Sequence, residues 1–192
     1  MTQTATTTLP AGLIPGTYVI DASHSEVGFT ARHAMVTKVR GRFSDVEGTL
    51  VFGPEAEGAT ANAVIKTASV DTRSADRDDH LRSADFFDAE TYPTITFRNR
   101  RVEGDLREEG DRFRLIGDLQ IRDTTMEVVL DCEFLGHGKD PWGKERGGFT
   151  AKGEIDRREW GLKWNQAIET GGVLVANRVR IEGEVQFVRD GE

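Results

Sequence analysis

The chain has 192 residues, 30% of them charged, with a net charge of −8 and one cysteine, Cys132. One domain is the default at this length, because all-β barrels and sandwiches reach it as single units. The acidic balance argues against a nucleic-acid partner or an anionic membrane surface, and a single cysteine excludes an internal disulfide and a CxxC metal site.

The N-terminal segment, residues 1–15, is rich in threonine and has neither strand nor helix periodicity. We expect a flexible tail there and one lipocalin-like barrel domain over residues 16–190. The segment lacks the basic start and the apolar run of a signal peptide, so the sequence predicts a cytoplasmic protein. No stretch approaches the roughly 18 apolar residues that a membrane-spanning helix needs, and no stable membrane insertion is expected.

A period of two begins at Thr17 and is typical of half-buried strands. After a break at residues 23–25, a second alternating run begins. The residues that it places on one face are Val27, Phe29, Ala31 and His33. Further short strands are predicted over residues 38–43, 47–52 and 59–70, and Ile65 is the clearest inward residue of the last.

The strand rhythm stops at residues 74–90, which predict a short helical insert. Its first turn is acidic, which suits the positive end of a helix dipole, and Asp78 is spaced to pair with Arg82. The residues expected to anchor it to the sheet are Leu81, Phe86 and Phe87. Pro93 then ends the insert, because the residue before a proline is pushed out of the α region.

Five alternating strands follow the insert. Their apolar faces are Ile95 and Phe97; Phe113, Leu115, Gly117, Leu119 and Ile121; Met126, Val128, Leu130, Cys132 and Phe134; Phe149, Ala151, Gly153 and Ile155; and Val179, Ile181, Gly183, Val185 and Phe187. A loop containing His137, Trp142 and Gly147 is expected before the fourth of them. Residues 158–172 predict a turn or short helix in which Trp160 and Trp164 are packing anchors, a role also expected of Trp142.

The clean alternation of apolar and polar residues indicates an antiparallel sheet with one wet and one dry face. About eight strands fit either a sandwich or an up-and-down barrel. Several small residues share the inward faces: Ala31, Gly117, Ala151, Gly153 and Gly183. They would leave a sandwich underpacked, whereas a barrel of this size can hold one small ligand. We therefore predict an all-β, antiparallel barrel with a cavity.

Strand parity also predicts which side chains line that cavity. They are Phe29, Ala31, His33, Ile65, Phe97, Leu115, Leu119, Val128, Leu130, Ala151, Val179, Ile181 and Val185. A register error of one residue would turn every one of them to the other face of the sheet.

Several motifs, taken in order, carry a resemblance to a known family. They are YVIDASHSEVGFTARH, GRF, VDTRSADRDDHLRSADFFDAETYPTITF, GDLQIRDTT, DPWGKERGGF and DRREWG. Together they run from Tyr18 to Val188 and resemble the YceI-like family of lipocalin-like, polyisoprenoid-binding proteins. The long central block is the most specific. One departure is Asp123, where the family usually has a glycine, which affects the local turn.

The resemblance implies an eight-stranded barrel with the helical insert near one end. It also implies a homodimer and an isoprenoid-tailed lipid or quinone as ligand, with no further cofactor. The residues alone do not distinguish an isoprenoid from a fatty acid as the ligand, because both require only an elongated apolar cavity.

The four histidines could suggest a metal site, but no pair has the spacing that chelates locally, and we predict none. His33 shares the parity of Phe29. It either donates a hydrogen bond to a ligand headgroup or is a satisfied histidine at the barrel rim. His24 and Ser25 favour a side-chain-to-backbone turn over a catalytic pair. Cys132 has inward parity and is expected to be a buried, small apolar residue.

The charged segment around Asp78 and His80 could be an acid–base site, or a capped helix packed on the sheet, and the latter is favoured because these acids suit the helix dipole. No phosphate-binding glycine motif or GxSxG elbow is present. The sequence therefore predicts no catalytic residues. The expected function is carriage or storage of one apolar molecule; the alternative is an enzyme that acts on a lipid-like substrate held in the barrel.

Overall fold

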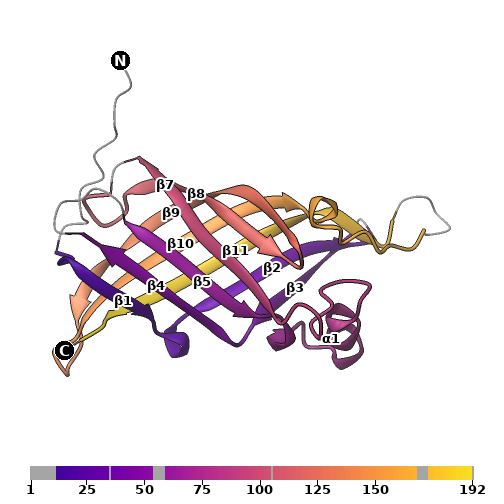
Figure 1. Ribbon diagram of the computed structural model, residues 1–192, viewed down its shortest axis with the longest axis horizontal. Coiled ribbons are helices and arrows are strands. Elements are labelled where there is room, and N and C mark those ends of the chain that lie inside the picture. Colours follow the sequence, from indigo (N-terminus) through magenta and orange to yellow (C-terminus); the bar gives the residue numbers. More distant parts are fainter. Residues whose placement is uncertain (1–11, 35, 54–58, 105, 168–172, 192) are drawn as a thin grey trace, which may run out of the picture.

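The structure is a computed structural model that describes residues 12–34, 36–53, 59–104, 106–167 and 173–191. Its strands form one antiparallel sheet that closes on itself into a barrel, with a single short helix at one end (Figure 1). The strand segments are β1 (Gly16–Ile20), β2 (Glu26–His33), β3 (Thr37–Phe43), β4 (Val46–Phe52), β5 (Thr60–Lys66), β6 (Val70–Asp71), β7 (Thr94–Gly104), β8 (Arg112–Ile121), β9 (Thr124–Lys139), β10 (Glu145–Asp156) and β11 (Val175–Arg189).

These eleven segments make eight long strands, because three of the strands are interrupted. β1 and β2 are separated by a 3₁₀ turn over Ala22–His24, β3 and β4 by two residues, and β5 and β6 by a 3₁₀ turn over Thr67–Ser69. Each long strand pairs with its neighbours in the chain, and β11 closes the ring by pairing with β10 on one edge and with both β1 and β2 on the other. The predicted eight-stranded up-and-down barrel is confirmed.

The interruptions are held by specific hydrogen bonds. The Asp21 carboxylate accepts a hydrogen bond from the Ser23 amide (3.1 Å) and so caps the first turn. The residues between β3 and β4 are hydrogen-bonded to the 3₁₀ turn between β5 and β6. The Asp45 amide donates to the Ser69 hydroxyl (3.2 Å), and the Ser44 amide donates to the Ser69 carbonyl (3.2 Å). Each break therefore satisfies the backbone groups that a continuous ladder would have paired.

The helix of the insert, α1 (Ala75–Arg82), is shorter than the predicted span, and turns follow it up to Pro93. The predicted pair of Asp78 with Arg82 is wrong. Asp78 is buried and accepts hydrogen bonds from the Thr72 amide (2.8 Å) and hydroxyl (2.5 Å). Arg82 binds Asp79 (2.9 Å) and the carbonyls of the preceding chain instead. The tertiary contact with the segment after β6 decides the pairing.

The anchoring residues of the insert lie where the sequence placed them. Phe86 is buried, with 7% of its surface exposed. Leu81 and Phe87 are half-buried against the core, and the Phe87 ring lies edge-on to Phe43, with 5.8 Å between centroids. The insert is thus packed onto the end of the barrel, beside β3 and β6.

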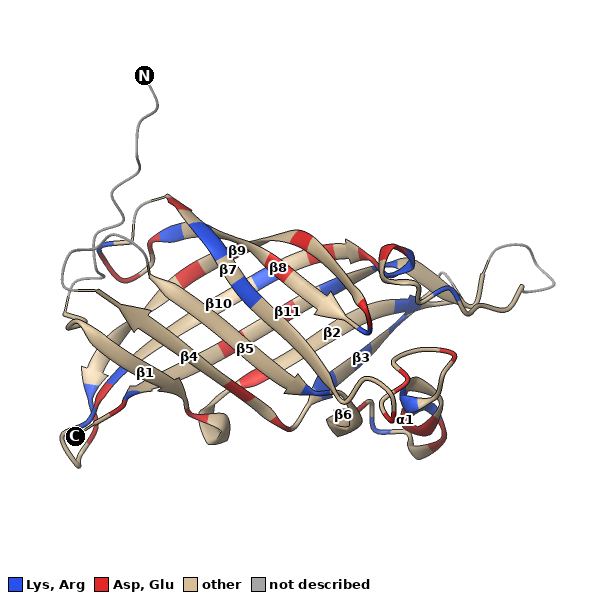
Figure 2. Ribbon diagram, viewed as in Figure 1, with Lys and Arg blue, Asp and Glu red and all other residues tan. Residues whose placement is uncertain are grey.

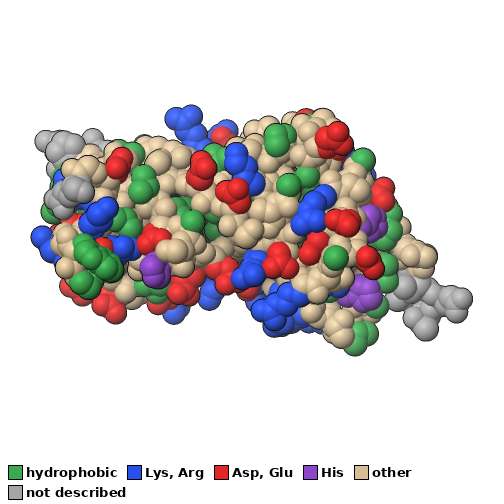
Figure 3. Space-filling model, turned by 90° about the horizontal axis from the view of Figure 1, so that it is seen from below, with side chains coloured by type: hydrophobic (Ala, Val, Ile, Leu, Met, Phe, Trp, Pro, Cys, Tyr) green, Lys and Arg blue, Asp and Glu red, His purple; other side chains and the backbone are tan. Residues whose placement is uncertain are grey.

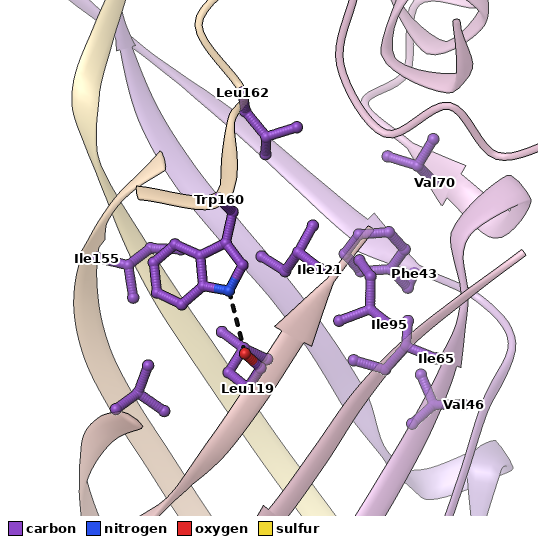
Figure 4. Close-up of a cluster of buried hydrophobic side chains, with 11 residues drawn as sticks. Phe43, Val46, Ile65, Val70, Ile95, Leu119, Ile121, Ile155, Trp160 and Leu162 are labelled. Carbon is purple, nitrogen blue, oxygen red and sulfur yellow. Dashed lines mark hydrogen bonds between the residues drawn. The ribbon is translucent and has the colours of Figure 1, made fainter. Parts of the chain in front are cut away.

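The apolar core divides into two clusters, one toward each end of the barrel. The cluster near the insert surrounds Trp160, whose indole is fully enclosed (Figure 4). The other cluster contains the rings of Tyr18, Phe52, Phe113, Phe134, Phe149 and Phe187. Leu13 packs into this second cluster with 6% of its surface exposed, so the described part of the predicted tail lies against the barrel. Residues 1–11 lie outside the described residues.

The β9–β10 hairpin differs from the predicted loop. Both strands extend further than expected, so His137 lies in β9, Gly147 in β10, and only residues 140–144 form the turn. Trp142 sits in that turn with 82% of its surface exposed, and its predicted role as a packing anchor is wrong. Within the described residues, no helix has the length and apolar character needed to span a bilayer.

Candidate ligand cavity

Two apolar cavities lie inside the barrel, one after the other along its length. The cavity nearer α1, here called the mouth cavity, has a volume of about 280 Å³. The other, here called the inner cavity, has a volume of about 180 Å³. Both are lined by Val27, Ile65, Leu119 and Ile181, so these four side chains mark the boundary between them. Together the two reach the size of small-molecule sites, roughly 300–1,000 Å³.

The mouth cavity is formed where the barrel meets the insert. Strands β2, β3 and β11 supply Phe29, Val39 and Val179, and the insert supplies Leu81 and Phe87. Charged and titratable side chains also line it: Arg32, His33, Arg77, His80 and Arg157. The inner cavity is lined by apolar residues of most of the strands, β11 among them, and includes three alanines of β5 and the segment before it, Ala59, Ala61 and Ala63.

All thirteen residues that strand parity predicted line one or both cavities. The mouth cavity has Phe29, Ala31, His33 and Val179; the inner cavity has Phe97, Leu115, Val128, Leu130, Ala151 and Val185; and Ile65, Leu119 and Ile181 border both. The register of the sheet therefore agrees with the sequence pattern. Contact of these residues with a ligand stays a prediction.

The small inward residues do not all leave space. A Cβ on Gly117 would lie 2.7 Å from the Phe97 ring, and one on Gly153 would lie 2.8 Å from the Leu130 side chain, so larger neighbours fill those positions. At Gly183 the nearest atoms would be at 3.8 and 3.9 Å, which is ordinary van der Waals contact. The expectation that small residues open the cavity thus holds at Gly183 and is wrong at Gly117 and Gly153.

Arg157 is a buried cation that the sequence pattern did not reveal. It is 4% exposed, and its guanidinium donates to four backbone carbonyls, those of Leu162, Trp164, Val175 and Ala176. Burial lowers the pKa of this guanidinium, although an arginine stays charged in proteins. The residue ties the turn after β10 to the start of β11 and so builds one side of the mouth cavity.

Two tryptophans lie in the same region, Trp160 in the core and Trp164 in the cavity lining. Trp160 is 2% exposed and donates its indole N–H to the Leu119 carbonyl at 3.0 Å, as Figure 4 shows. Trp164 lines the cavity and lies edge-on to the His80 ring, with 4.5 Å between centroids. His80 Nε2 is 2.8 Å from an Asp85 carboxylate oxygen, which orients the imidazole at the mouth. His33 lies at the rim and is exposed.

A second polar cluster lies outside the cavities, near the first break in the barrel wall. Asp21 accepts hydrogen bonds from the Ser23 hydroxyl (2.5 Å) and from Arg146 (2.6 Å), which hold the pKa of its carboxyl well below the usual range. His24 Nδ1 faces both the Ser23 hydroxyl (3.0 Å) and Asp21 (2.9 Å). A serine–histidine–aspartate relay uses the two different ring nitrogens, so this cluster lacks that geometry.

The remaining titratable candidates have structural surroundings. Cys132 is 6% exposed and lines the inner cavity, and burial raises the pKa of its thiol to about 12, which leaves it a poor nucleophile. The Ser25 hydroxyl accepts a hydrogen bond from the Gln186 amide at 2.9 Å, so it fixes the turn beside it. Among the described residues, no three His, Cys, Asp or Glu side chains are grouped to hold a metal ion.

Comparison with known proteins places this geometry in a family. The model of the YceI-like domain matches residues 18–187. A UPF0312 protein of Staphylococcus epidermidis is 36% identical over 172 residues, which cover 88% of this chain and 96% of that protein. The crystal structure of the Campylobacter jejuni YCEI protein superposes with a TM-score of 0.69 at 31% identity, covering 89% of this chain and 96% of that one. A polyisoprenoid binding domain from Saccharophagus degradans has the same fold, with a TM-score of 0.65 at 18% identity, and covers 92% and 99%.

Proposed function

Since the chain belongs to the YceI-like family, we propose that it binds one molecule with a long apolar tail, an isoprenoid lipid or a quinone, inside the barrel. The observation that carries this proposal is the pair of cavities lined by apolar side chains and arranged end to end. A protein of the same fold is described as a polyisoprenoid binding domain, which supports the choice of tail. The role would be transport, storage or sequestration of that molecule.

The arrangement of polar groups gives the ligand a direction. The mouth cavity has the charged or titratable side chains His33, His80 and Arg157 in its lining, with Arg32 and Arg77, whereas the inner cavity is lined mainly by apolar residues, with the buried thiol of Cys132 among them. An apolar tail would therefore enter the inner cavity, and a polar end would stay near the mouth. Each methylene that leaves water contributes roughly 0.8 kcal/mol, before the costs of ordering the tail and fixing the complex are subtracted.

Filling the inner cavity should abolish ligand retention without unfolding the protein. A Cβ at Gly183 meets its neighbours only at ordinary contact distance, so Gly183→Leu extends a side chain into the inner cavity, and Ala151→Phe does so from the neighbouring strand. We expect both variants to melt near the parent temperature and to carry no lipid through purification. The measurement is mass spectrometry of the organic extract, which also separates an isoprenoid or quinone from a fatty acid.

Gly138→Leu is the matched control, because a Cβ at this exposed position of β9 would meet no atom within 4 Å. It should keep the lipid content of the parent. Loss of the fold in both filling variants would indicate a tightly packed interior, where overpacking costs about 1–3 kcal/mol. If the protein is instead an enzyme, His33→Ala or His80→Ala should remove turnover of a lipid-like substrate and leave the amount of retained lipid unchanged.

We further propose that the protein is a homodimer and that β1, β4 and β5 form the contact. Within these strands the only charged residues are Glu47 and Lys66, and Figure 2 shows this wall largely without charge. Its outward side chains are Thr17, Val19, Thr49, Val51, Asn62 and Val64. Charges are depleted at the centre of protein interfaces, which supports this choice of surface.

In sedimentation velocity the protein is expected at the mass of two 21.3 kDa chains, and Val19→Lys with Val51→Lys should shift it to one. These valines are 37% and 38% exposed. Val129→Lys with Leu135→Lys is the control, since those residues are equally exposed (46% and 40%) on β9. A parent that sediments as a single chain would refute the dimer, and an equal response of both double variants would refute the interface.

A further inference from the structure

The hairpin of β2 and β3 stands at the mouth of the barrel and carries an unusual charge pattern. Its inward residues His33 and Val39 line the mouth cavity. Its outward residues include Arg32, Lys38 and Arg40, all exposed, and Arg32 also borders the mouth cavity. The tip of the hairpin adds Val36, which is 76% exposed. A basic face with an apolar tip thus borders the opening.

Three neighbouring cations of this hairpin lack the ion pairs that several arginines of the barrel wall form. Arg100, Arg112, Arg114 and Arg178 each form an ion pair with a carboxylate on the same or a neighbouring strand. In the part of the chain that the structure describes, Arg32, Lys38 and Arg40 form none, whereas Arg42, further from the tip on β3, pairs with Asp71 at 3.0 Å. The contrast is notable in a chain whose net charge is −8. The net charge is a sum over the whole chain, so a local basic surface is compatible with it.

The register of the hairpin adds an energetic cost. Arg32 and Lys38 are direct partners across β2 and β3, so two like charges face each other. Such a pair destabilises an antiparallel sheet relative to a neutral pair. An anionic partner would relieve the repulsion. Figure 2 shows basic segments along β3 toward the end where α1 lies. In Figure 3, which shows the molecule from below, basic and acidic side chains are interspersed over the surface.

We propose that the outer face of the β2–β3 hairpin docks the mouth of the barrel on the surface of an anionic lipid bilayer. Lysine and arginine near such a surface each contribute attraction, and the exposed Val36 side chain can enter the apolar boundary beneath the headgroups. The outer face presents no aromatic side chain on which a base could stack, which favours lipid over single-stranded nucleic acid. Docking of the hairpin on the bilayer does not depend on which molecule the cavity contains.

The test is flotation of the full chain with vesicles of phosphatidylcholine alone and of phosphatidylcholine with phosphatidylglycerol. We expect binding to the second kind only, weakened by added salt. Arg32→Glu with Lys38→Glu should reduce that binding at least about 25-fold, because each of the two basic residues near the surface is worth roughly a factor of five. Arg40→Glu, a single change at an exposed site, should reduce it by roughly fivefold or more.

Arg112→Glu with Lys144→Glu is the matched control. It changes the net charge by the same amount at exposed positions of β8 and the β9–β10 turn, away from the mouth, and should leave vesicle binding unchanged. Equal binding to both kinds of vesicle, no binding to either, or an equal loss in the control would overturn the proposal. Salt-sensitive binding to a DNA duplex without binding to vesicles would also overturn it, in favour of a nucleic-acid partner.

Discussion

Arg157→Met is expected to lower the free energy of unfolding by at least about 3 kcal/mol, because it leaves several backbone carbonyls without a donor. Arg157 is 4% exposed and donates to four carbonyls, which join the turn after β10 to the start of β11. A buried acceptor that loses its partner costs about 1–3 kcal/mol. Methionine keeps most of the length and apolar volume of the side chain, so the loss reports on the hydrogen bonds.

Arg158→Met is the control for this change. Arg158 is the next residue, its side chain is 55% exposed, and it pairs with Asp156 at 2.6 Å. Exposed ion pairs contribute about 0–1 kcal/mol, so this variant should melt close to the parent. Thermal unfolding followed by circular dichroism separates the two, since one kcal/mol corresponds to roughly 2–4 °C at this chain length. Similar melting temperatures for both variants would mean that water replaces the guanidinium without cost.

Phe86→Ala is expected to cost about 3–5 kcal/mol, the usual range for truncating a well-buried phenylalanine. Phe86 is 7% exposed, and its ring lies 5.1 Å from His80 and 5.3 Å from Trp164, measured between centroids. Truncation would remove the ring contact of Phe86 with Trp164, one of the contacts between the insert and the wall of the mouth cavity. We expect a lower melting temperature and a change in tryptophan fluorescence, because Trp164 loses a neighbour.

Trp142→Ala is the matched control for that experiment. It also removes a large aromatic side chain, but one that is 82% exposed in the β9–β10 turn, so it should change stability by no more than about 0.5 kcal/mol. If Phe86→Ala alters the fluorescence while the melting temperature stays at the parent value, the insert unfolds independently of the barrel. The insert would then be an appendage and not part of the cooperative unit.

Much of the barrel could be predicted from the sequence because a strand repeats every two residues. The alternation at Leu115, Leu119 and Ile121, for example, fixes which face is inward, and the same rule placed all the predicted lining residues. The sequence pattern does not show that the two segments on either side of each break belong to one long strand. The breaks depend on hydrogen bonds between segments distant in the chain, such as that from Asp45 to Ser69.

The polar side of the mouth could not be predicted for a related reason. Arg157 lies in a run of charged residues, between Asp156 and Arg158, and nothing in the local pattern distinguishes the buried member. Its burial follows from the fold of residues up to 19 positions away, whose carbonyls it binds. Asp78 was predicted to pair locally and instead binds Thr72, because tertiary contact outweighs helix spacing.

The way the ring closes has a consequence for how the chain folds. β11 pairs with β10 on one edge and with β1 and β2 on the other, so partners such as Tyr18 and Arg189 are separated by most of the chain. Neighbouring strands can pair as hairpins while the chain is being synthesised. The edge of β1 and β2 that pairs with β11 stays open until β11 has been made. Until then both edges of the sheet present unpaired amides and carbonyls, which makes the open sheet the species most prone to aggregate. Folding should consequently be slow, because its final pairing spans the longest sequence separation in the fold.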